Sequence, residues 1–213
     1  MSKILTSVSF LLAILVAAPM AAAAAGGAAK TPTLNPDDHV MGQTSAPVTM
    51  IEYASLTCPH CAAFEEEDLP AIKKKWIDTG KVKLVYRDFP LDGYALKASM
   101  LARCAPDDRY FQFIESFFES QENWVTAADP TAALTEIARL GGMTADATKR
   151  CFADKKLEKA IVKERFTANK DYGVDSTPTF FILGANGTTK IEGAEPIADF
   201  DTALAAAMPK GKG

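Results

Sequence analysis

Residues 48–61 read VTMIEYASLTCPHC, and this stretch decides the fold. Its first part, Val48–Ala54, is rich in β-favouring side chains and apolar on both parities except at Glu52. Such a run is typical of a buried parallel strand, because both faces of that kind of strand are covered. Two cysteines, Cys58 and Cys61, follow just before a helix-like stretch. The sequence therefore predicts a strand, a cysteine pair and a helix, in that order.

The helix-like stretch covers residues 62–77, and a second strand follows it. Acids occupy its first turns at Glu65–Asp68, and lysines lie near its end at Lys73–Lys75, which complements the helix dipole. Pro70 should kink or divide the helix, because proline lacks an amide donor. The run KVKLVYRDF at 81–89 alternates polar and apolar side chains in its first half and predicts the next strand.

Residues 91–172 contain no strand signal and are predicted to be all-helical. Apolar side chains recur there at spacings of three and four, as on one face of a helix. These side chains are Tyr110, Phe113, Ile114, Phe117 and Phe118. We interpret them as core packing rather than as a ligand site. Glycine and proline signals divide the region into four or five predicted helices.

The end of the chain returns to strand character. The run TFFIL at 179–183 and the residues 188–192 predict a hairpin around a turn at Ala185–Gly187. A closing helix is expected over Ile197–Met208. The predicted fold class is α/β, with an all-helical segment inserted into it.

Composition excludes some functions. The chain has 213 residues and 48% hydrophobic side chains, which is enough for one well-buried core with an inserted subdomain. Its formal net charge is −4, and it has no basic cluster. We therefore expect neither nucleic acid nor anionic lipid as a natural partner.

The N-terminus has the pattern of a secretory signal. Lys3 precedes an apolar run from Ile4 to Ala18, and small residues that suit cleavage follow it. We predict a signal peptide at residues 1–25, with its end left open between Ala24 and Lys30, and a periplasmic location. The alternative is an uncleaved membrane anchor, which the serines and the proline in this region disfavour. Residues 26–47 contain three prolines and are predicted to be a lead-in segment before the folded unit.

Export changes how the four cysteines are read, because disulfides form and persist outside the cytosol. Cys58 and Cys61 form a tight pair. Cys104 and Cys151 stand alone in the helical region, far apart in sequence. Two pairs with such different spacing suggest two functions.

The motif Cys58-Pro59-His60-Cys61 can close a disulfide at the start of a helix. The first sulfur would lie among unpaired backbone amides at the positive end of the helix dipole. Pro59 stiffens the turn and His60 can donate a hydrogen bond or a positive charge, so the pKa of Cys58 should be low. Each unit of pKa depression stabilises the thiolate by about 1.4 kcal/mol, or about 30 mV in a two-electron couple. Cys58 is the predicted nucleophile and Cys61 the less exposed resolving thiol.

A cysteine pair with this spacing can also be half of a zinc site. Such a site needs two further ligands, whereas Cys104 and Cys151 are lone helical residues and His39 lies in the lead-in segment. We therefore expect no metal and no other cofactor. A non-catalytic zinc or binding module is the remaining alternative to an enzyme.

Together these features resemble the DsbA family of thiol-disulfide oxidoreductases. The resemblance rests on Glu52, the Cys58–Cys61 motif, Phe64-Glu65-Glu66, the helical insertion, and Thr177-Pro178 just before a strand. It covers nearly all of the mature chain and implies a thioredoxin-like fold with an inserted all-helical subdomain.

The resemblance also implies how the chain is divided. Residues 48–90 and 173–213 would be the two parts of the thioredoxin-like domain, and residues 91–172 the helical insertion.

The same resemblance implies roles for residues outside the motif. Pro178 would be cis and, with Thr177, would face the sulfurs and bind an extended substrate chain through its backbone. Glu52 matches a buried acid beneath the disulfide that accepts or relays the proton of the resolving thiol. Its place on an apolar strand suggests this independently, and a partly exposed strand-end glutamate is the alternative. Glu65 also matches a family acid, but it would suit any helix N-terminus.

Cys104 and Cys151 resemble the extra disulfide of some alphaproteobacterial DsbA proteins. A bridge between them would close a loop of about 48 residues and contribute on the order of 4 kcal/mol in the chain-entropy model. We expect a structural bridge that also tunes the nearby redox site. Two free buried thiols are the alternative.

The implied activity is the oxidation of dithiols in reduced or unfolded exported proteins, followed by reoxidation by a membrane quinone-linked thiol oxidase. An isomerase or reductase on the same scaffold is the alternative, because Thr177 stands where the enteric oxidases have valine. Isomerases of the superfamily carry long N-terminal oligomerisation segments, and the segment before the first strand is short here. We therefore expect a monomeric oxidase.

Overall fold

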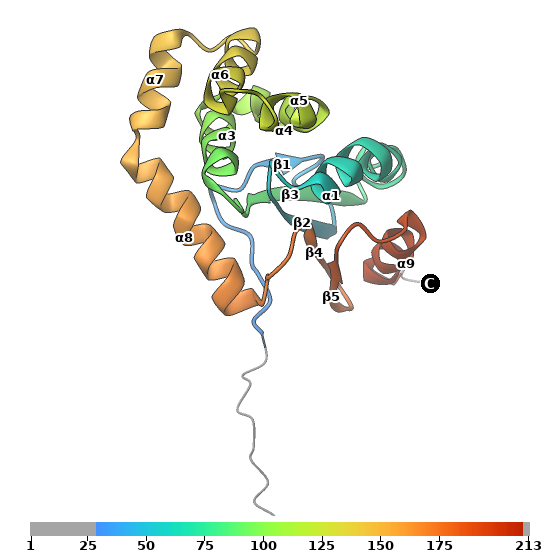
Figure 1. Ribbon diagram of the computed structural model, residues 1–213. Helices are drawn as coiled ribbons and strands as arrows, with labels where there is room; N and C mark the ends of the chain where they lie inside the picture. Colours follow the sequence, from blue (N-terminus) through green and yellow to red (C-terminus); the bar gives the residue numbers. More distant parts are fainter. Residues whose placement is uncertain (1–28, 211–213) are drawn as a thin grey trace, which may run out of the picture.

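The computed structural model describes residues 29–210, and of Asp107 it describes only the backbone. The centre of this part is a mixed five-stranded sheet with the order β1-β3-β2-β4-β5 (Figure 1). The strands are Val40–Met41 (β1), Val48–Ala54 (β2), Val82–Asp88 (β3), Thr179–Gly184 (β4) and Gly187–Glu192 (β5). β2 and β3 are parallel, whereas the other pairs are antiparallel. The α/β fold class and the four predicted strands are confirmed.

Every residue of β2 is buried, because helices cover both faces of the sheet. Met50 packs with Phe64 and Phe200 on one face. Ile51 belongs to the cluster on the opposite face, together with Ala168. This two-sided burial is what an uninterrupted apolar strand predicts.

The helical run after β2 begins at Pro59, earlier than the predicted residue 62, and ends at Ile77. It is made of α1 (Pro59–Ala63), the π-helical turn η1 (Phe64–Asp68), α2 (Leu69–Ile72) and the π-helical turn η2 (Lys73–Ile77). Pro70 lies in the first turn of α2, just after a π-helical turn. The run is thus divided beside Pro70, as its missing amide donor predicts.

The helical insertion contains six α-helices among the described residues, so the prediction of four or five was wrong. They are α3 (Gly93–Cys104), α4 (Tyr110–Glu119), α5 (Gln121–Val125), α6 (Pro130–Leu140), α7 (Ala145–Ala153) and α8 (Lys155–Tyr172), with a short 3₁₀ turn, η3, at Asp107–Arg109. Ser120 separates α4 from α5, and Asp154 caps α8 by accepting hydrogen bonds from its first amides. Polar residues rather than glycine or proline make these breaks, and the sequence signals missed them.

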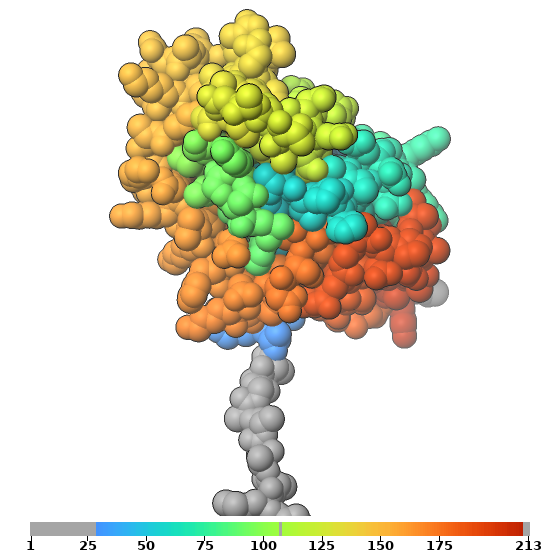
Figure 2. All heavy atoms as spheres, in the orientation of Figure 1, coloured from blue at the N-terminus to red at the C-terminus, as the bar shows by residue number. Residues whose placement is uncertain are grey.

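Figure 1 shows α3 to α7 gathered beyond one end of the sheet, while α8 runs back alongside it to β4. The apolar side chains that were predicted as core are all buried in α4, which confirms their packing role. In the space-filling view, the start of the helical run after β2 lies at the surface between the helical insertion and the C-terminal part of the chain (Figure 2).

The C-terminal hairpin of β4 and β5 and the closing helix α9 (Ile197–Ala207) are confirmed. β4 packs very closely against α9. A Cβ atom on Gly184 would lie 2.1 Å from the carbonyl oxygen of Ala207, so only glycine fits this approach.

The lead-in segment is part of the folded unit, contrary to the prediction. Val40 and Met41 form β1 and pair with β3. Asp38 accepts hydrogen bonds from Arg87, which is 2% exposed. A buried guanidinium needs an anionic partner, and the segment at Asp38 supplies it. The division at residues 90 and 172 stays a prediction.

The predicted signal peptide at residues 1–25 lies outside the described residues. Within residues 29–210, none of the helices combines the length and the apolar character that crossing a membrane requires.

Candidate active site

The cysteine pair lies where β2 gives way to α1. Cys58 is the last residue before the helix and has extended backbone angles, φ −84° and ψ 119°. Pro59 takes the first helical position, where its missing amide costs no hydrogen bond. The carbonyl of Cys58 accepts hydrogen bonds from the amides of Cys61 and Ala62, at 3.1 and 3.2 Å. The two thiols, which are free in this structure, therefore sit at a helix N-terminus as the motif predicts.

The Thr177–Pro178 peptide bond is cis and faces the first cysteine. The Sγ atom of Cys58 lies 3.3 Å from the carbonyl oxygen of Thr177, across a sequence separation of 119 residues. Cys58 is 5% exposed and Cys61 is fully buried. The cis bond and the lower exposure of Cys61 were both predicted and are confirmed.

The two thiols have opposed acidities. The pKa of Cys58 falls from 9.0 to about 5, mainly because the thiol of Cys61 donates a hydrogen bond to it. Burial opposes this shift, while the side chain of Thr177 and the backbone amides of Cys61 and His60 add to it. Burial also raises the pKa of Cys61 far above its ordinary value. At neutral pH Cys58 is therefore a thiolate and Cys61 a thiol.

His60 contributes through its backbone, and its side chain is exposed. The predicted effect of the imidazole on Cys58 stays a prediction.

Glu52 lies beneath the cysteines and is fully buried. Neither of its carboxylate oxygens has a hydrogen-bond partner among the described residues. Burial raises its pKa well above the ordinary value, and the negative charges of Glu65 and Cys58 add to the shift. The alternative of a partly exposed strand-end glutamate is excluded. The catalytic role of Glu52 stays a prediction.

Glu65 is close enough to Glu52 for their charges to interact. Burial, together with the charge of Glu115, raises the pKa of Glu65 to about 8. The position of Glu65 in the acidic first turns of the helix did not indicate this raised pKa.

The helical insertion supplies a contact that the sequence did not reveal. The buried side-chain amide of Gln121 donates hydrogen bonds to the carbonyls of Leu56 and Cys58, both at 3.0 Å. The hydroxyl of Thr57 donates to Asp92, at the start of α3. Both contacts span long sequence separations, so no local pattern could have indicated them.

Cys104 and Cys151 form a disulfide with a Cα–Cα distance of 6.1 Å, which confirms the predicted bridge. It joins the end of α3 to α7. The two half-cystines pack in the same apolar cluster as Cys58 and Cys61. Their predicted effect on the redox site stays a prediction.

Within residues 29–210, no three histidine, cysteine, aspartate or glutamate side chains gather as they would around a metal ion.

The sequence model of the family described as thioredoxin matches residues 16–206. The chain belongs to the thioredoxin family. One curated relative is a Rickettsia bellii protein named as a protein-disulfide oxidoreductase. This chain is 34% identical to it over 152 residues. That match covers 71% of this chain and 59% of the relative. The chain spans only 54–59% of the length of the five Rickettsia relatives.

A shorter relative in the thioredoxin family is Disulfide bond formation protein D of Bacillus subtilis. It is 29% identical over 154 residues, which cover 67% of this chain and 66% of that protein.

Solved structures agree with this family assignment. Wolbachia pipientis alpha-DsbA1 is similar with a TM-score of 0.75 and 36% identity, over 82% of this chain and 92% of that chain. A protein-disulfide isomerase from Novosphingobium aromaticivorans is similar with a TM-score of 0.67 and 25% identity. The match covers 79% of this chain and 96% of that chain. The thioredoxin-like fold with a helical insertion and the resemblance to DsbA proteins are confirmed.

Proposed function

We propose that this protein catalyses thiol-disulfide exchange and oxidises pairs of thiols in reduced or unfolded exported proteins. The observation that carries the proposal is the opposed acidity of Cys58 and Cys61 beside the cis Thr177–Pro178 bond. A thiol with a pKa near 5 leaves readily as a thiolate, so the Cys58–Cys61 disulfide would be a strong oxidant. The names of the relatives, which concern protein disulfides, support the same activity.

The reaction would begin when a substrate thiolate attacks the Sγ atom of Cys58. The Cys58–Cys61 bond breaks, and Cys61 leaves with the electron pair. Because burial raises the pKa of Cys61, its thiolate must take up a proton, and the buried carboxyl of Glu52 would supply it. A second substrate thiolate then attacks the substrate sulfur of the mixed disulfide and releases Cys58 as a thiolate. The substrate loses two electrons and the protein ends as a dithiol.

The substrate chain would lie against the cis-proline loop. The carbonyl of Thr177 already points at Cys58, and an extended peptide passing Pro178 would bring its own sulfur to the same place.

We further propose that the protein works in the periplasm as a monomer. A membrane quinone-linked thiol oxidase would restore the disulfide, because each turnover leaves the cysteine pair reduced.

Isomerisation on the same site is the second candidate. The similar Novosphingobium protein is described as a protein-disulfide isomerase, and threonine rather than valine precedes the cis proline here. An isomerase acts on wrong disulfides, whereas an oxidase acts on free thiols.

Two refolding assays separate these candidates. We expect the oxidised protein to restore activity to reduced ribonuclease faster than to scrambled ribonuclease. Equal or better rescue of scrambled ribonuclease would identify an isomerase, and rescue of neither form would contradict thiol-disulfide exchange.

The roles of the two cysteines can be tested separately. Cys58→Ser should abolish exchange, whereas Cys61→Ser should trap mixed disulfides with substrate that non-reducing gels detect. If Cys61→Ser traps no such species while Cys58→Ser does, the two roles are reversed.

A further inference from the structure

Six buried side-chain oxygens among the described residues have no hydrogen-bond partner, and five of them lie in one region. These five belong to Glu52, Tyr86, Asp88 and Tyr110, each at most 2% exposed. A buried polar group without a partner costs about 1–3 kcal/mol. Such a cluster in a folded protein points to a role in the chemistry rather than in stability.

The four side chains lie in a continuous series that runs from β2 through β3 to α4. Glu52 and Tyr86 are direct neighbours on β2 and β3, so they point to the same face of the sheet. Asp88 lies two residues beyond Tyr86 and shares that face. The rings of Tyr86 and Tyr110 meet edge to face, with 6.3 Å between their centroids. Tyr110 in turn stacks on His39 at 3.6 Å.

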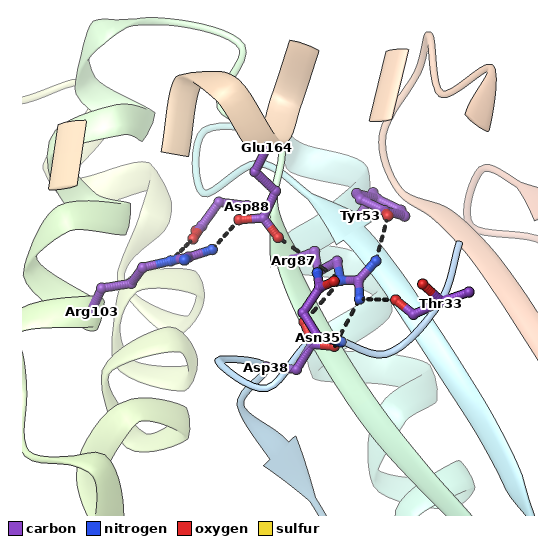
Figure 3. A network of polar contacts seen from close by, with 8 residues as sticks. All are labelled: Thr33, Asn35, Asp38, Tyr53, Arg87, Asp88, Arg103 and Glu164. Carbon is purple, nitrogen blue, oxygen red and sulfur yellow. Dashed lines mark hydrogen bonds and ion pairs between the residues drawn. The ribbon is translucent and has the colours of Figure 1, made fainter. Parts of the chain in front are cut away.

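This path reaches a polar cavity at the outer edge of β3. β1 pairs with two residues of β3, and within residues 29–210 no strand covers the edge from Tyr86 onward. A cavity of about 470 Å³ lies there, and its walls include Tyr86, His39, Arg103 and Glu164. Figure 3 shows Arg103 bonded to both Asp88 and Glu164 at this place. A polar space of this size can hold water and exchange protons with the solvent.

We propose that Tyr86 and Tyr110 conduct protons between Glu52 and this cavity. The proposal rests on the proposed function and concerns the moment when Cys61 gains or loses its proton. Glu52 has two oxygens, so it can accept a proton from Cys61 on one and release a proton from the other. A tyrosine hydroxyl can likewise accept one hydrogen bond and donate another when water enters from the cavity, so no charge accumulates in the buried region.

The step is balanced when glutathione disulfide oxidises the reduced protein. The thiolate of Cys58 first forms a mixed disulfide and releases one glutathione thiolate. Cys61 then loses its proton along the path and attacks the Sγ atom of Cys58. The bond from Cys58 to the remaining glutathione breaks, and that glutathione leaves with the electron pair. Two electrons pass to glutathione disulfide, and one proton reaches the cavity.

The ionisable groups that face the path come from several elements. Those around Glu52 are Cys58, Cys61, Glu65 and Tyr86. Those around the two tyrosines are Asp88, Arg103 and Glu164, with Glu65 also near Tyr110. Glu65 offers the competing exit, because it lines a separate groove of about 780 Å³ between the active-site helix and α4.

The test compares the reduced wild-type protein with Tyr86→Phe and Tyr110→Phe in the reaction with glutathione disulfide. Acid quenching and mass spectrometry report the formation of the mixed disulfide and its resolution as separate rates. We expect each substitution to slow resolution about tenfold, less than the 10²–10⁴ of a group in direct contact with the reacting atoms. Formation, which uses only Cys58, should keep the wild-type rate. A purely structural role would change both rates or neither.

Tyr53→Phe is the matched control. Tyr53 also lines the cavity, but its hydroxyl accepts a hydrogen bond from Arg87 on the other face of the sheet, so resolution should stay at the wild-type rate. Removing the unpartnered hydroxyl of Tyr86 should leave the midpoint of urea unfolding unchanged or raised, which shows that the variant folds.

Wild-type resolution rates in both Tyr86→Phe and Tyr110→Phe would overturn the path. Slow resolution in Glu65→Gln alone would overturn it too, because protons would then leave through the groove. A wild-type protein that forms no mixed disulfide, or never resolves one, would instead contradict the proposed function.

Discussion

Four groups lower the pKa of Cys58: the thiol of Cys61, the side chain of Thr177, and the backbone amides of Cys61 and His60. The thiol of Cys61 contributes most. The acidity of the nucleophile therefore depends on its own resolving partner, beyond the helix terminus that the sequence indicates.

We expect Cys61→Ala to raise the pKa of Cys58 by about one to two units, because a hydrogen bond to a charged group is worth about 1.5–3 kcal/mol. Thiolate absorbance at 240 nm against pH measures the shift. Cys61→Ser is the control, since its hydroxyl still donates and the pKa should rise less. Equal pKa values in the wild type and both variants would contradict this account.

His60→Gln gives a second comparison at the same sulfur. The substitution keeps the backbone amide that contributes to Cys58, so it isolates the imidazole. A rise in the pKa of Cys58 would support the predicted tuning role, and an unchanged titration would remove it.

At the scale of elements, prediction from sequence succeeded where the signal was local. Val48–Ala54 was predicted with its observed limits, because burial on both faces leaves an unbroken apolar run. The break between α4 and α5 was missed, because Ser120 is not a strong helix breaker. The place of the lead-in segment was also missed, since the need of Arg87 for Asp38 is visible only once β3 is folded.

The candidate site divides in the same way. The cysteine motif and Glu52 could be placed because each lies in or beside a recognisable strand, whereas the place of Pro178 was implied by the resemblance to the DsbA family. Gln121 could not, because its contacts with Leu56 and Cys58 depend on how the helical insertion docks onto the active-site turn.

The disulfide between α3 and α7 should stabilise the helical insertion. We expect the double variant Cys104→Ala, Cys151→Ala to lose up to about 4 kcal/mol of unfolding free energy, because the bridge closes a long loop in the unfolded chain. Urea unfolding of the oxidised proteins measures the loss.

Cys104→Ala and Cys151→Ala as single variants are the controls, and each should lose about as much as the double variant. An unchanged midpoint in all three variants would show that the bridge does not stabilise the fold.

At the scale of the whole molecule, three glutamates sit in surroundings that disfavour their charge. Burial raises the pKa of Glu164 to about 7 and that of Glu65 to about 8, and it raises the pKa of Glu52 strongly. In the unfolded chain all three would ionise near their ordinary value of 4.5. Their contribution to stability is therefore complete below pH 4.5 and is lost as the pH rises, through about 7 for Glu164 and about 8 for Glu65.

Cys58 acts in the opposite direction, and only when the disulfide is open. Its folded pKa of about 5 lies below the ordinary 9.0, so its contribution is complete above pH 9 and is lost as the pH falls through 5.

We expect the oxidised protein to lose stability between pH 4.5 and 8, by at most about 1.4 kcal/mol per pH unit for each glutamate. Glu52→Gln and Glu164→Gln should each make this slope shallower.

Urea unfolding in reducing buffer isolates the cysteine, because wild type and Cys58→Ser then differ only at that position. From pH 5 to pH 9, the unfolding free energy of the wild type should increase relative to that of the variant, by at most about 1.4 kcal/mol per pH unit. A gap that stays constant over this range would mean that folding does not favour the thiolate of Cys58. The reduced state would then gain nothing from an ionised Cys58, and the thermodynamic reason for an oxidising disulfide would be lost.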